Sequence, residues 1–262
     1  MFNDLLPTPL PPAQKLPVRV RARQAAAKPY LGAVFRLLLA ILALLAVASC
    51  GRPLTLAERE FMLGLQGESF NPTPVRIVRN PLVGITERTY PARPRNTCRE
   101  RIQPPPDGPT FTGSTAGIVL FQHLHTRPGN YLEDYVARSD GALNLAAVMF
   151  FAHEMTHVWQ WQNRDVTGYH PFRAFAEQLS TIDPYLFDSH SRPRFLDYGY
   201  EQQASLVEEY VCCRLLDPGG DRTARLQRLL RQSIPLTSRL DRLDGLVTLV
   251  PWDGVERGGI CS

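Results

Sequence analysis

Lysine is nearly missing from this sequence: Lys15 and Lys28 are the only two, so every later basic residue is arginine or histidine. The whole chain has a formal net charge of +4. Residues 1–49 contain six basic residues and one acidic residue, which leaves residues 50–262 with a net charge of −1. A body this close to neutral offers no strong field for a polyanion. We therefore expect no nucleic-acid partner.

Long apolar runs are also scarce. The aliphatic run from Leu37 to Ser49 has 13 residues, whereas a helix needs about 20 to span a bilayer. A run this short after a basic stretch is typical of a secretion signal. Its small residues directly before Cys50 resemble a bacterial lipobox; an ordinary membrane anchor is the alternative. We expect a targeting segment over 1–49, a lipid on Cys50 that anchors the protein to the membrane, and a location in the bacterial cell envelope, at the outer membrane facing the periplasm.

Cysteine is sparse, with five residues in the chain. Setting Cys50 aside leaves an even number, and an exported protein meets an oxidising compartment in which disulfides persist. A bond between the neighbours Cys212 and Cys213 would require a strained ring. We therefore expect each of them to pair with one of the distant cysteines, Cys98 and Cys261, in an order left open. Buried free thiols are the alternative.

One short stretch carries a recognisable chemistry. Apolar residues at steps of three and four predict a helix from Leu143 to Asn163. It contains His153, Glu154 and His157 in the spacing H-E-x-x-H. Residues four apart share a helix face, so both imidazoles can reach one ion. Glu154 is then placed to act on a water as general base.

A third metal ligand must come from elsewhere in the chain. Positions 160 and 163 are Gln and Asn, so the compact three-histidine pattern is absent. A second helix, predicted from Asp197 to Leu216, presents Glu201 near its start. Two histidines and one glutamate leave the fourth position for water, as catalytic zinc requires. Candidates for orienting a zinc histidine are Ser205, Glu208 and Asp197, and candidates for donating to an oxyanion are Tyr198, Tyr200, Tyr210, His170 and His190.

The segments AHEMTHVWQ (152–160) and YEQQAS (200–205) resemble gluzincin-type metallopeptidases, including the HtpX-like and CAAX-prenyl-protein peptidases. They are more similar to the peptidase domain of core proteins in extracellular contractile injection systems, over residues 73–215. The resemblance implies a zincin-like α+β fold for residues 51–262, in which a small twisted sheet packs on the motif helix. It also implies Zn²⁺ held by His153, His157 and Glu201. Ser205 stands where related enzymes often have Asp, which puts the partner of a zinc histidine in doubt.

These features predict a zinc-dependent endopeptidase that acts on a protein or peptide. The strand expected at Ile118–Phe121 would align an extended substrate by backbone pairing. An alternative is an envelope binding or assembly lipoprotein, with a partner in an envelope complex, whose zincin domain is structural or weakly active. A fourth protein ligand such as His190 would favour it. A weaker alternative is a zinc hydrolase acting on a non-protein envelope substrate.

Other segments frame this site. Thr55 is a candidate N-cap, with Glu58 at the capping-box position. A strand is expected at Val75–Val78, and residues 91–109 are a proline- and arginine-rich loop, disordered or a functional flap. A third helix is expected at Asp221–Ser233. The aromatic residues Trp159, Trp161, Phe172 and Phe175 are interpreted as core packing.

Overall fold

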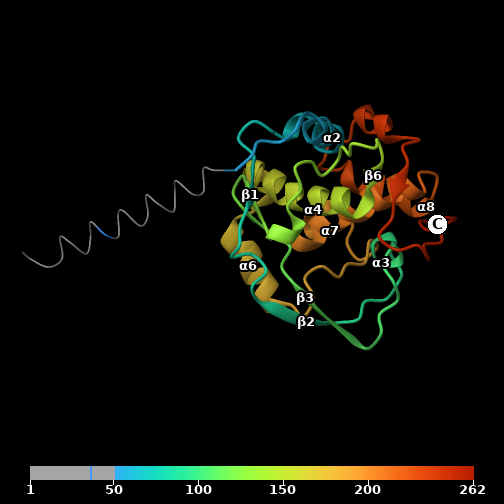
Figure 1. Cartoon of the computed structure of the whole chain (residues 1–262), viewed down its shortest axis with the longest axis horizontal. Coiled ribbons are helices and arrows are strands. Elements are labelled where there is room, and N and C mark those ends of the chain that lie inside the picture. The colour runs from blue at the N-terminus through green and yellow to red at the C-terminus, as the bar shows by residue number, and fades with distance from the viewer. Residues whose placement is uncertain (1–35, 37–50) are drawn as a thin grey trace, which may run out of the picture. The chain divides into compact units, whose positions relative to one another are not determined.

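The computed structural model describes Arg36 and residues 51–262. Apart from Arg36, the predicted targeting segment lies outside the described residues, and so does Cys50. Residues 51–262 fold as helices with small sheets, an α+β arrangement (Figure 1). Among the helices of the described residues, none is long and apolar enough to cross a membrane.

The main sheet has three strands in the order β1–β5–β4. β1 pairs with β5 in parallel, and β4 pairs with β5 antiparallel, which leaves β4 at an edge of this sheet. Two smaller pairs accompany it: an antiparallel hairpin of β2 and β3, and a short parallel pair of β6 and β7. The strands are β1 Arg76–Arg79, β2 Glu87–Pro91, β3 Thr110–Ser114, β4 Gly117–Leu120, β5 His123–Thr126, β6 Leu143–Asn144 and β7 Thr248–Leu249.

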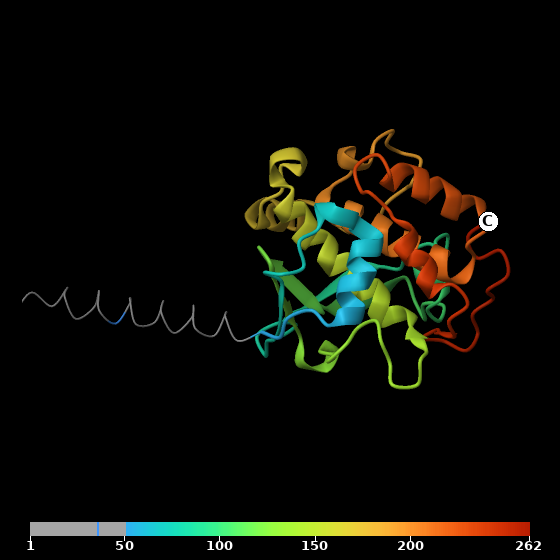
Figure 2. The same ribbon diagram turned by 90° about the horizontal axis from the view of Figure 1, so that it is seen from above.

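The helices surround two long central ones, α4 and α7, which pack against each other and carry the candidate site (Figures 1 and 2). α2 and α8 flank this pair, α6 packs against α7, and β4 and β5 contact α4. The α-helices are α2 Leu56–Gln66, α3 Cys98–Arg101, α4 Leu145–Gln162, α5 Arg164–Thr167, α6 Pro171–Ser180, α7 Tyr200–Leu216 and α8 Asp221–Leu230; the 3₁₀ turns are η1 Gly67–Ser69, η2 Pro128–Asn130, η3 Phe195–Asp197 and η4 Ser238–Leu243.

Local sequence explains where these helices begin. Thr55 and Glu58 form the expected capping box of α2, because the Thr55 hydroxyl accepts from the Glu58 amide and the Glu58 carboxylate accepts from the Thr55 amide. α4 begins two residues later than expected because the side chain of Asn144 caps it by accepting from the Ala147 amide at 3.2 Å. The preceding Leu143 pairs with β7 instead.

One apolar core holds these elements together, with side chains from α2, α4, α7, α8 and the main sheet. Its buried members all lie between Leu54 and Cys261. Residues 51–262 therefore contain a complete core and can fold without the preceding segment. The largest fully buried side chains include Tyr210, Phe151, Phe195 and Leu206.

Two disulfides tie α7 to distant parts of the chain. Cys98 bonds to Cys212, and Cys213 bonds to Cys261. Each of the two adjacent cysteines thus pairs with one distant cysteine, as expected from their neighbouring positions. The first bond fastens α3 against α7, and the second fastens the C-terminal end of the chain to the same helix.

Several sequence expectations need correction. The region 91–109 contains α3 and is bonded to α7 through Cys98, so the disordered alternative is wrong for it. Gly113 and Ser114 belong to β3. The strand His123–Thr126 was not anticipated. Trp159 is buried as expected, but the core interpretation is wrong for Phe172 and Phe175, whose side chains are 76% and 59% exposed.

Candidate metal centre

The candidate site lies where α4 packs against the first turn of α7. His153 and His157 are one helical turn apart on α4, so both rings face α7. Glu201 is the second residue of α7 and lies opposite them. All three side chains are buried. The three residues that the sequence predicts as metal ligands therefore lie close together in the structure.

The three side chains converge on one point. Nε2 of His153 and Nε2 of His157 each lie 3.2 Å from Oε2 of Glu201. One ligand atom from each residue falls within 4.8 Å of the other two. Two imidazole nitrogens and a carboxylate oxygen are a donor set that suits zinc.

The outer nitrogen of each ring has its own acceptor. Nδ1 of His153 lies 3.2 Å from Oε2 of Glu208, and Nδ1 of His157 lies 2.8 Å from Oε1 of Gln160. The amide nitrogen of Gln160 donates to the Tyr200 carbonyl, which fixes its oxygen toward His157. Both Nδ1 atoms therefore carry the hydrogen.

This arrangement leaves the inner nitrogens without hydrogens when the rings are neutral. Two lone pairs then face the Glu201 carboxylate at 3.2 Å, which is repulsive unless positive charge lies between them. Either protons on both rings or one cation can supply that charge. A carboxylate or amide oxygen behind each ligating histidine is also the usual support of a zinc site. The residues present thus fit a zinc ion held by His153, His157 and Glu201.

Electrostatics point the same way. Burial lowers the pKa of His153, but hydrogen bonds to Glu201 and Glu208 outweigh it and raise this pKa to about 10. The pKa of His157 is also raised, because the charge of Glu201 outweighs burial. Burial alone would raise the pKa of Glu201, yet the charges and hydrogen bonds of the two histidines hold it well below its usual range. The pocket as a whole favours positive charge at its centre.

Glu154 lies beside the three candidate ligands and is 7% exposed. Burial raises its pKa, and this effect exceeds the opposing charges of His153 and His157. The edge strand β4 passes directly against it: a Cβ atom on Gly117 would come within 2.9 Å of Glu154 Oε1. Only glycine lets the backbone of β4 approach this carboxylate so closely.

Neighbouring residues hold Glu201 and Glu208 of α7 in place. The side-chain amide of Gln178, on α6, donates to Oε1 of Glu201. Arg99, on α3, donates from Nη1 to Oε2 of Glu208 at 3.2 Å and from Nη2 to the Tyr185 carbonyl at 3.2 Å. Its charge keeps the pKa of Glu208 low despite burial, which by itself would raise it. The Cys98–Cys212 bond lies one residue from Arg99 and fastens it to α7.

Two tyrosines that the sequence did not single out border the centre. The ring of Tyr185 lies 5.8 Å from that of His153, and the ring of Tyr169 lies 6.0 Å from that of His157. Burial, together with the charges of Glu201 and Glu154, raises the pKa of both phenols. Within residues 51–262 the Tyr185 hydroxyl has no hydrogen-bond partner. It is therefore free to donate to a bound molecule.

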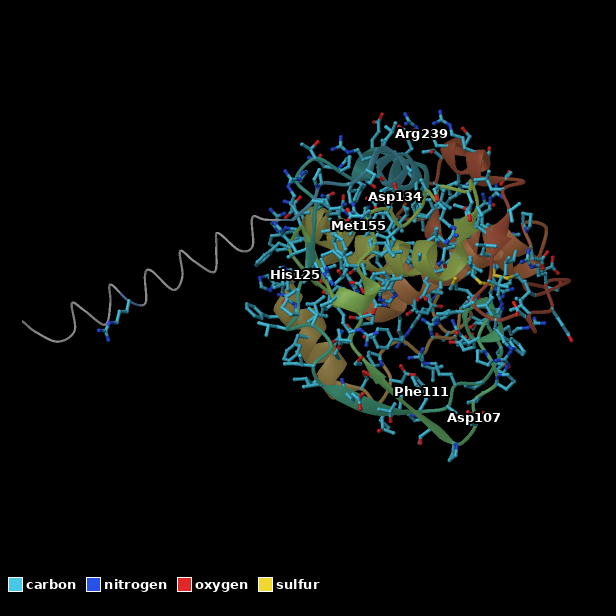
Figure 3. The ribbon with its side chains drawn as sticks, in the orientation of Figure 1. Asp107, Phe111, His125, Asp134, Met155 and Arg239 are labelled. Carbon is cyan, nitrogen blue, oxygen red and sulfur yellow. A yellow bond between two sulfur atoms is a disulfide. The ribbon has the colours of Figure 1, made fainter. Side chains whose placement is uncertain are left out.

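Tyr185 is held over the site by a neighbouring arginine. The Arg93 guanidinium lies 5.5 Å from the Tyr185 ring and 5.6 Å from the Phe111 ring of β3. It also binds the Asp183 carboxylate with two hydrogen bonds, of 2.6 and 2.9 Å. The hairpin that carries Phe111 runs along the lower side in Figure 3, apart from Met155 on α4. Arg93 thus joins this hairpin to the loop after α6.

The structure separates the other expected residues into one that contacts the site and several that do not. Glu208 contacts His153 as expected. Ser205 is buried with an unpartnered hydroxyl and makes no hydrogen bond to a ligand histidine. The remaining candidates are engaged elsewhere: Tyr198 donates to the Asp188 carbonyl, Tyr200 to the Gly168 carbonyl, His170 caps α6, Asp197 pairs with Arg194, and Tyr210 lies in the core.

His190 was considered as a fourth ligand, and its position argues against this role. Its side chain is 65% exposed and pairs with Asp188 at 3.3 Å. Within the described part of the chain, the cluster that contains His153, His157 and Glu201 has no fourth metal-ligating member. Three protein ligands leave one position of a four-coordinate zinc ion unfilled.

Comparison with known proteins adds little. No family model matches the chain, and no curated protein is similar to it in sequence. Among solved structures, the chain is similar to the effector domain of Pseudomonas aeruginosa VgrG2b, with 22% identity and a TM-score of 0.43. The match covers 76% of this chain and 97% of that chain. A likeness this distant decides neither fold nor function, so the zincin-like fold stays a prediction.

Proposed function

We propose that this chain is a zinc-dependent metalloendopeptidase of the bacterial cell envelope, anchored by a lipid on Cys50. The observation that carries this proposal is the pair of histidine Nε2 atoms, each 3.2 Å from one oxygen of Glu201, with both Nδ1 atoms held by acceptors. A buried carboxylate, Glu154, stands beside this donor set. That combination suits hydrolysis assisted by a metal ion.

Zinc, when bound, supplies Lewis acidity, which polarises a carbonyl and makes water more acidic. The protein supplies the proton carrier. Burial raises the pKa of Glu154, so this carboxylate can take a proton from the attacking water, hold it and deliver it to the leaving amine. Tyr185 is the candidate donor to the oxygen that becomes negative, because its hydroxyl is free and its ring borders His153.

The edge strand supports a peptide substrate. β4 pairs with β5 on one side, and Gly117 at its start abuts Glu154. A substrate strand that paired with the other side of β4 would bring a peptide bond next to this carboxylate. Ile118 and Leu120, which are 43% and 45% exposed, would lie along such a peptide.

The assembly-lipoprotein alternative called for a fourth protein ligand that closes the site. His190 is exposed and lies outside the candidate ligand cluster, and no other member completes it among residues 51–262. The open coordination that remains favours hydrolysis over a purely structural metal. The remaining alternative, a hydrolase that acts on a non-protein envelope substrate, is distinguished by the test below.

The test compares the wild-type protein with Glu154→Gln and with a matched control, Glu133→Gln, at an exposed position. Metal content by mass spectrometry should show zinc close to one equivalent in all three. Cleavage of an unfolded protein should be lost only in Glu154→Gln. Equal cleavage by Glu154→Gln and wild type would remove the mechanism. Amidase activity on cell-wall fragments with no cleavage of peptides would redirect it to a non-protein substrate.

A further inference from the structure

α6 exposes its apolar face. Phe172, Phe175 and Leu179 recur at steps of three and four, so they lie on one face of the helix. They are 76%, 59% and 65% exposed, and Ile182, just beyond the helix, is 80% exposed. Only Ala174 of this helix is buried. A surface helix of a soluble domain normally turns such a face to the core. We therefore expect another molecule or surface to cover the exposed face of α6.

The exposed face continues onto neighbouring elements. Phe121, in the turn between β4 and β5, packs edge-on against Trp161 with ring centroids 4.8 Å apart. His170 lies 5.9 Å from Trp161 and 5.3 Å from Phe172, and so joins the turn to α6. We call this surface the aromatic ridge; its apolar members are Phe121, Trp161, Phe172, Phe175, Leu179 and Ile182.

One member of the ridge, Phe121, has a strained backbone conformation. Phe121 has a φ of 59°, and no other non-glycine residue among those described has a positive φ. It sits in a two-residue turn between Leu120 and His123, where glycine or asparagine is the favoured residue. A phenylalanine in this conformation is costly, and strain of this kind gathers at functional positions. Its ring is nevertheless 45% exposed.

The ridge lies close to the point where the described chain begins. A Cβ atom on Gly51 would lie 2.9 Å from Cβ of Arg76. Arg76 pairs with His123, which follows Phe121 by two residues. α6 and β1 lie on the same side of the molecule in Figures 1 and 2, and His125 of β5 marks that side in Figure 3. In the sequence, the aliphatic run Leu37–Ser49 ends one residue before Cys50.

Arginines border the ridge. Arg164 stacks on Trp161 at 4.7 Å, and Arg173 follows Phe172 on α6. Neither side chain, nor that of Arg76, has a carboxylate within salt-bridge distance among the described residues. Unpaired arginines around exposed aromatic and aliphatic side chains are the composition of a surface that lies on anionic lipid.

We propose that the aromatic ridge docks on the surface of the membrane to which the chain is tethered. The lipid anchor would determine which part of residues 51–262 lies near the bilayer. The ridge would then provide a second contact with the membrane, made by the folded residues themselves. α6 links this contact to the metal centre, because Gln178 donates to Glu201 and the Glu177 carboxylate accepts from the Tyr200 amide. Docking of α6 would hold the centre at a fixed height above the lipid. This inference rests on the ridge and on the lipid anchor of the proposed function, and not on catalysis.

The first test uses residues 51–262, which contain the complete core, so that the tether plays no part. Cosedimentation is measured with vesicles of phosphatidylcholine containing a minority of phosphatidylglycerol. Phe172→Ser combined with Phe175→Ser should lower partitioning about tenfold. The control, Leu82→Ser with Ile85→Ser, removes two side chains of 73% and 71% exposure beyond the opposite end of β1, and should leave partitioning unchanged. Both substitution pairs are exposed, so zinc content and circular dichroism should match the wild type.

Failure of the wild type to bind these vesicles, or equal loss in both variants, would overturn the proposal. A change in oligomeric state with no change in partitioning would assign the ridge to a protein interface and would also overturn it. The second test uses the full chain reconstituted in vesicles with brominated lipid. Quenching of tryptophan fluorescence should occur in the wild type and fall in Trp161→Phe. Equal quenching in the two would contradict membrane docking.

Discussion

Oε2 of Glu208 lies 3.2 Å from Nδ1 of His153, and the same oxygen accepts from Arg99. This carboxylate is the one that orients the first motif histidine. It lies three residues after Ser205 on α7, whose hydroxyl makes no hydrogen bond to a ligand histidine. The arginine that supports this carboxylate comes from α3.

Replacing Glu208 by Gln should weaken zinc binding about 10–100-fold. Glutamine can still accept from the ring, but it removes the charge that fixes the tautomer and pairs with Arg99. The measurement is zinc transfer to a chelator of known affinity at equilibrium. Glu133→Gln serves as the control and should hold zinc like the wild type. Unchanged affinity in Glu208→Gln would mean that Glu208 does not orient His153.

Tyr185→Phe should lower kcat about 10²–10³-fold, with little effect on KM, because an oxyanion donor acts in the transition state. Tyr198→Phe is the matched control. The Tyr198 hydroxyl donates to the Asp188 carbonyl, so its loss should affect stability and leave kcat near the wild-type value. If Tyr185→Phe retains full turnover while its zinc content is normal, the donor must be sought elsewhere.

The two disulfides should differ in their effect on the metal centre. Cys98→Ser with Cys212→Ser should lower the unfolding free energy by about 2–5 kcal/mol. It should also weaken zinc binding, since Arg99 is then attached to α7 only through its hydrogen bonds to Glu208 and Glu209. Cys213→Ser with Cys261→Ser should lower stability with a smaller effect on zinc. Urea unfolding and chelator competition measure the two quantities. Equal loss of zinc affinity in both pairs would contradict this distinction.

A pH-dependent contribution to stability should come from His125 on β5. Burial lowers its pKa, with a further lowering from His123. The Asn80 amide, whose oxygen accepts from the Leu82 amide, lies 3.3 Å from Nδ1 and disfavours a hydrogen there. The unfolded chain therefore binds this proton more tightly than the folded one. Its contribution is complete above the unfolded pKa and is lost as pH falls toward the lower folded value.

His125→Gln should consequently lose less stability than the wild type between pH 7 and pH 5, when unfolding by urea is compared at the two values. Apart from the neighbouring His123, the titrating groups have the same surroundings in both proteins, so the difference reports on this pair of rings. His190→Gln, at an exposed position, should follow the wild type. A steeper acid loss in His125→Gln than in the wild type would reverse the assigned direction.

The sequence allowed the prediction of elements with strong local signals. The apolar period of α4, the H-E-x-x-H spacing and the capping box of α2 are local patterns, and the observed elements follow them within a few residues. The position of Glu201 on a second helix could be predicted because the carboxylate opens a strongly periodic segment. Its meeting with His153 and His157 depends on the packing of two helices, which the structure supplies.

The rest depended on contacts between residues far apart in the chain. Arg99 and Glu208 are separated by 109 positions, and nothing in either local sequence relates them. Gln160 was noted only as a position without histidine, although its amide oxygen holds His157. β5 is too short and too polar to read as a strand. The period of α6 was recognisable, but a helical period cannot tell whether an apolar face meets a core or a different surface.

The two disulfides of α7 also depend on the redox state of the compartment. The helix that carries Glu201 and Glu208 is fastened through Cys212 to α3 and through Cys213 to the end of the chain. Neither bond persists in a reducing cytoplasm. Without the two bonds, this helix would be held by packing and by polar contacts such as that of Arg99 with Glu208. An oxidising compartment would complete this brace, so the centre would be fully braced only where both bonds can form.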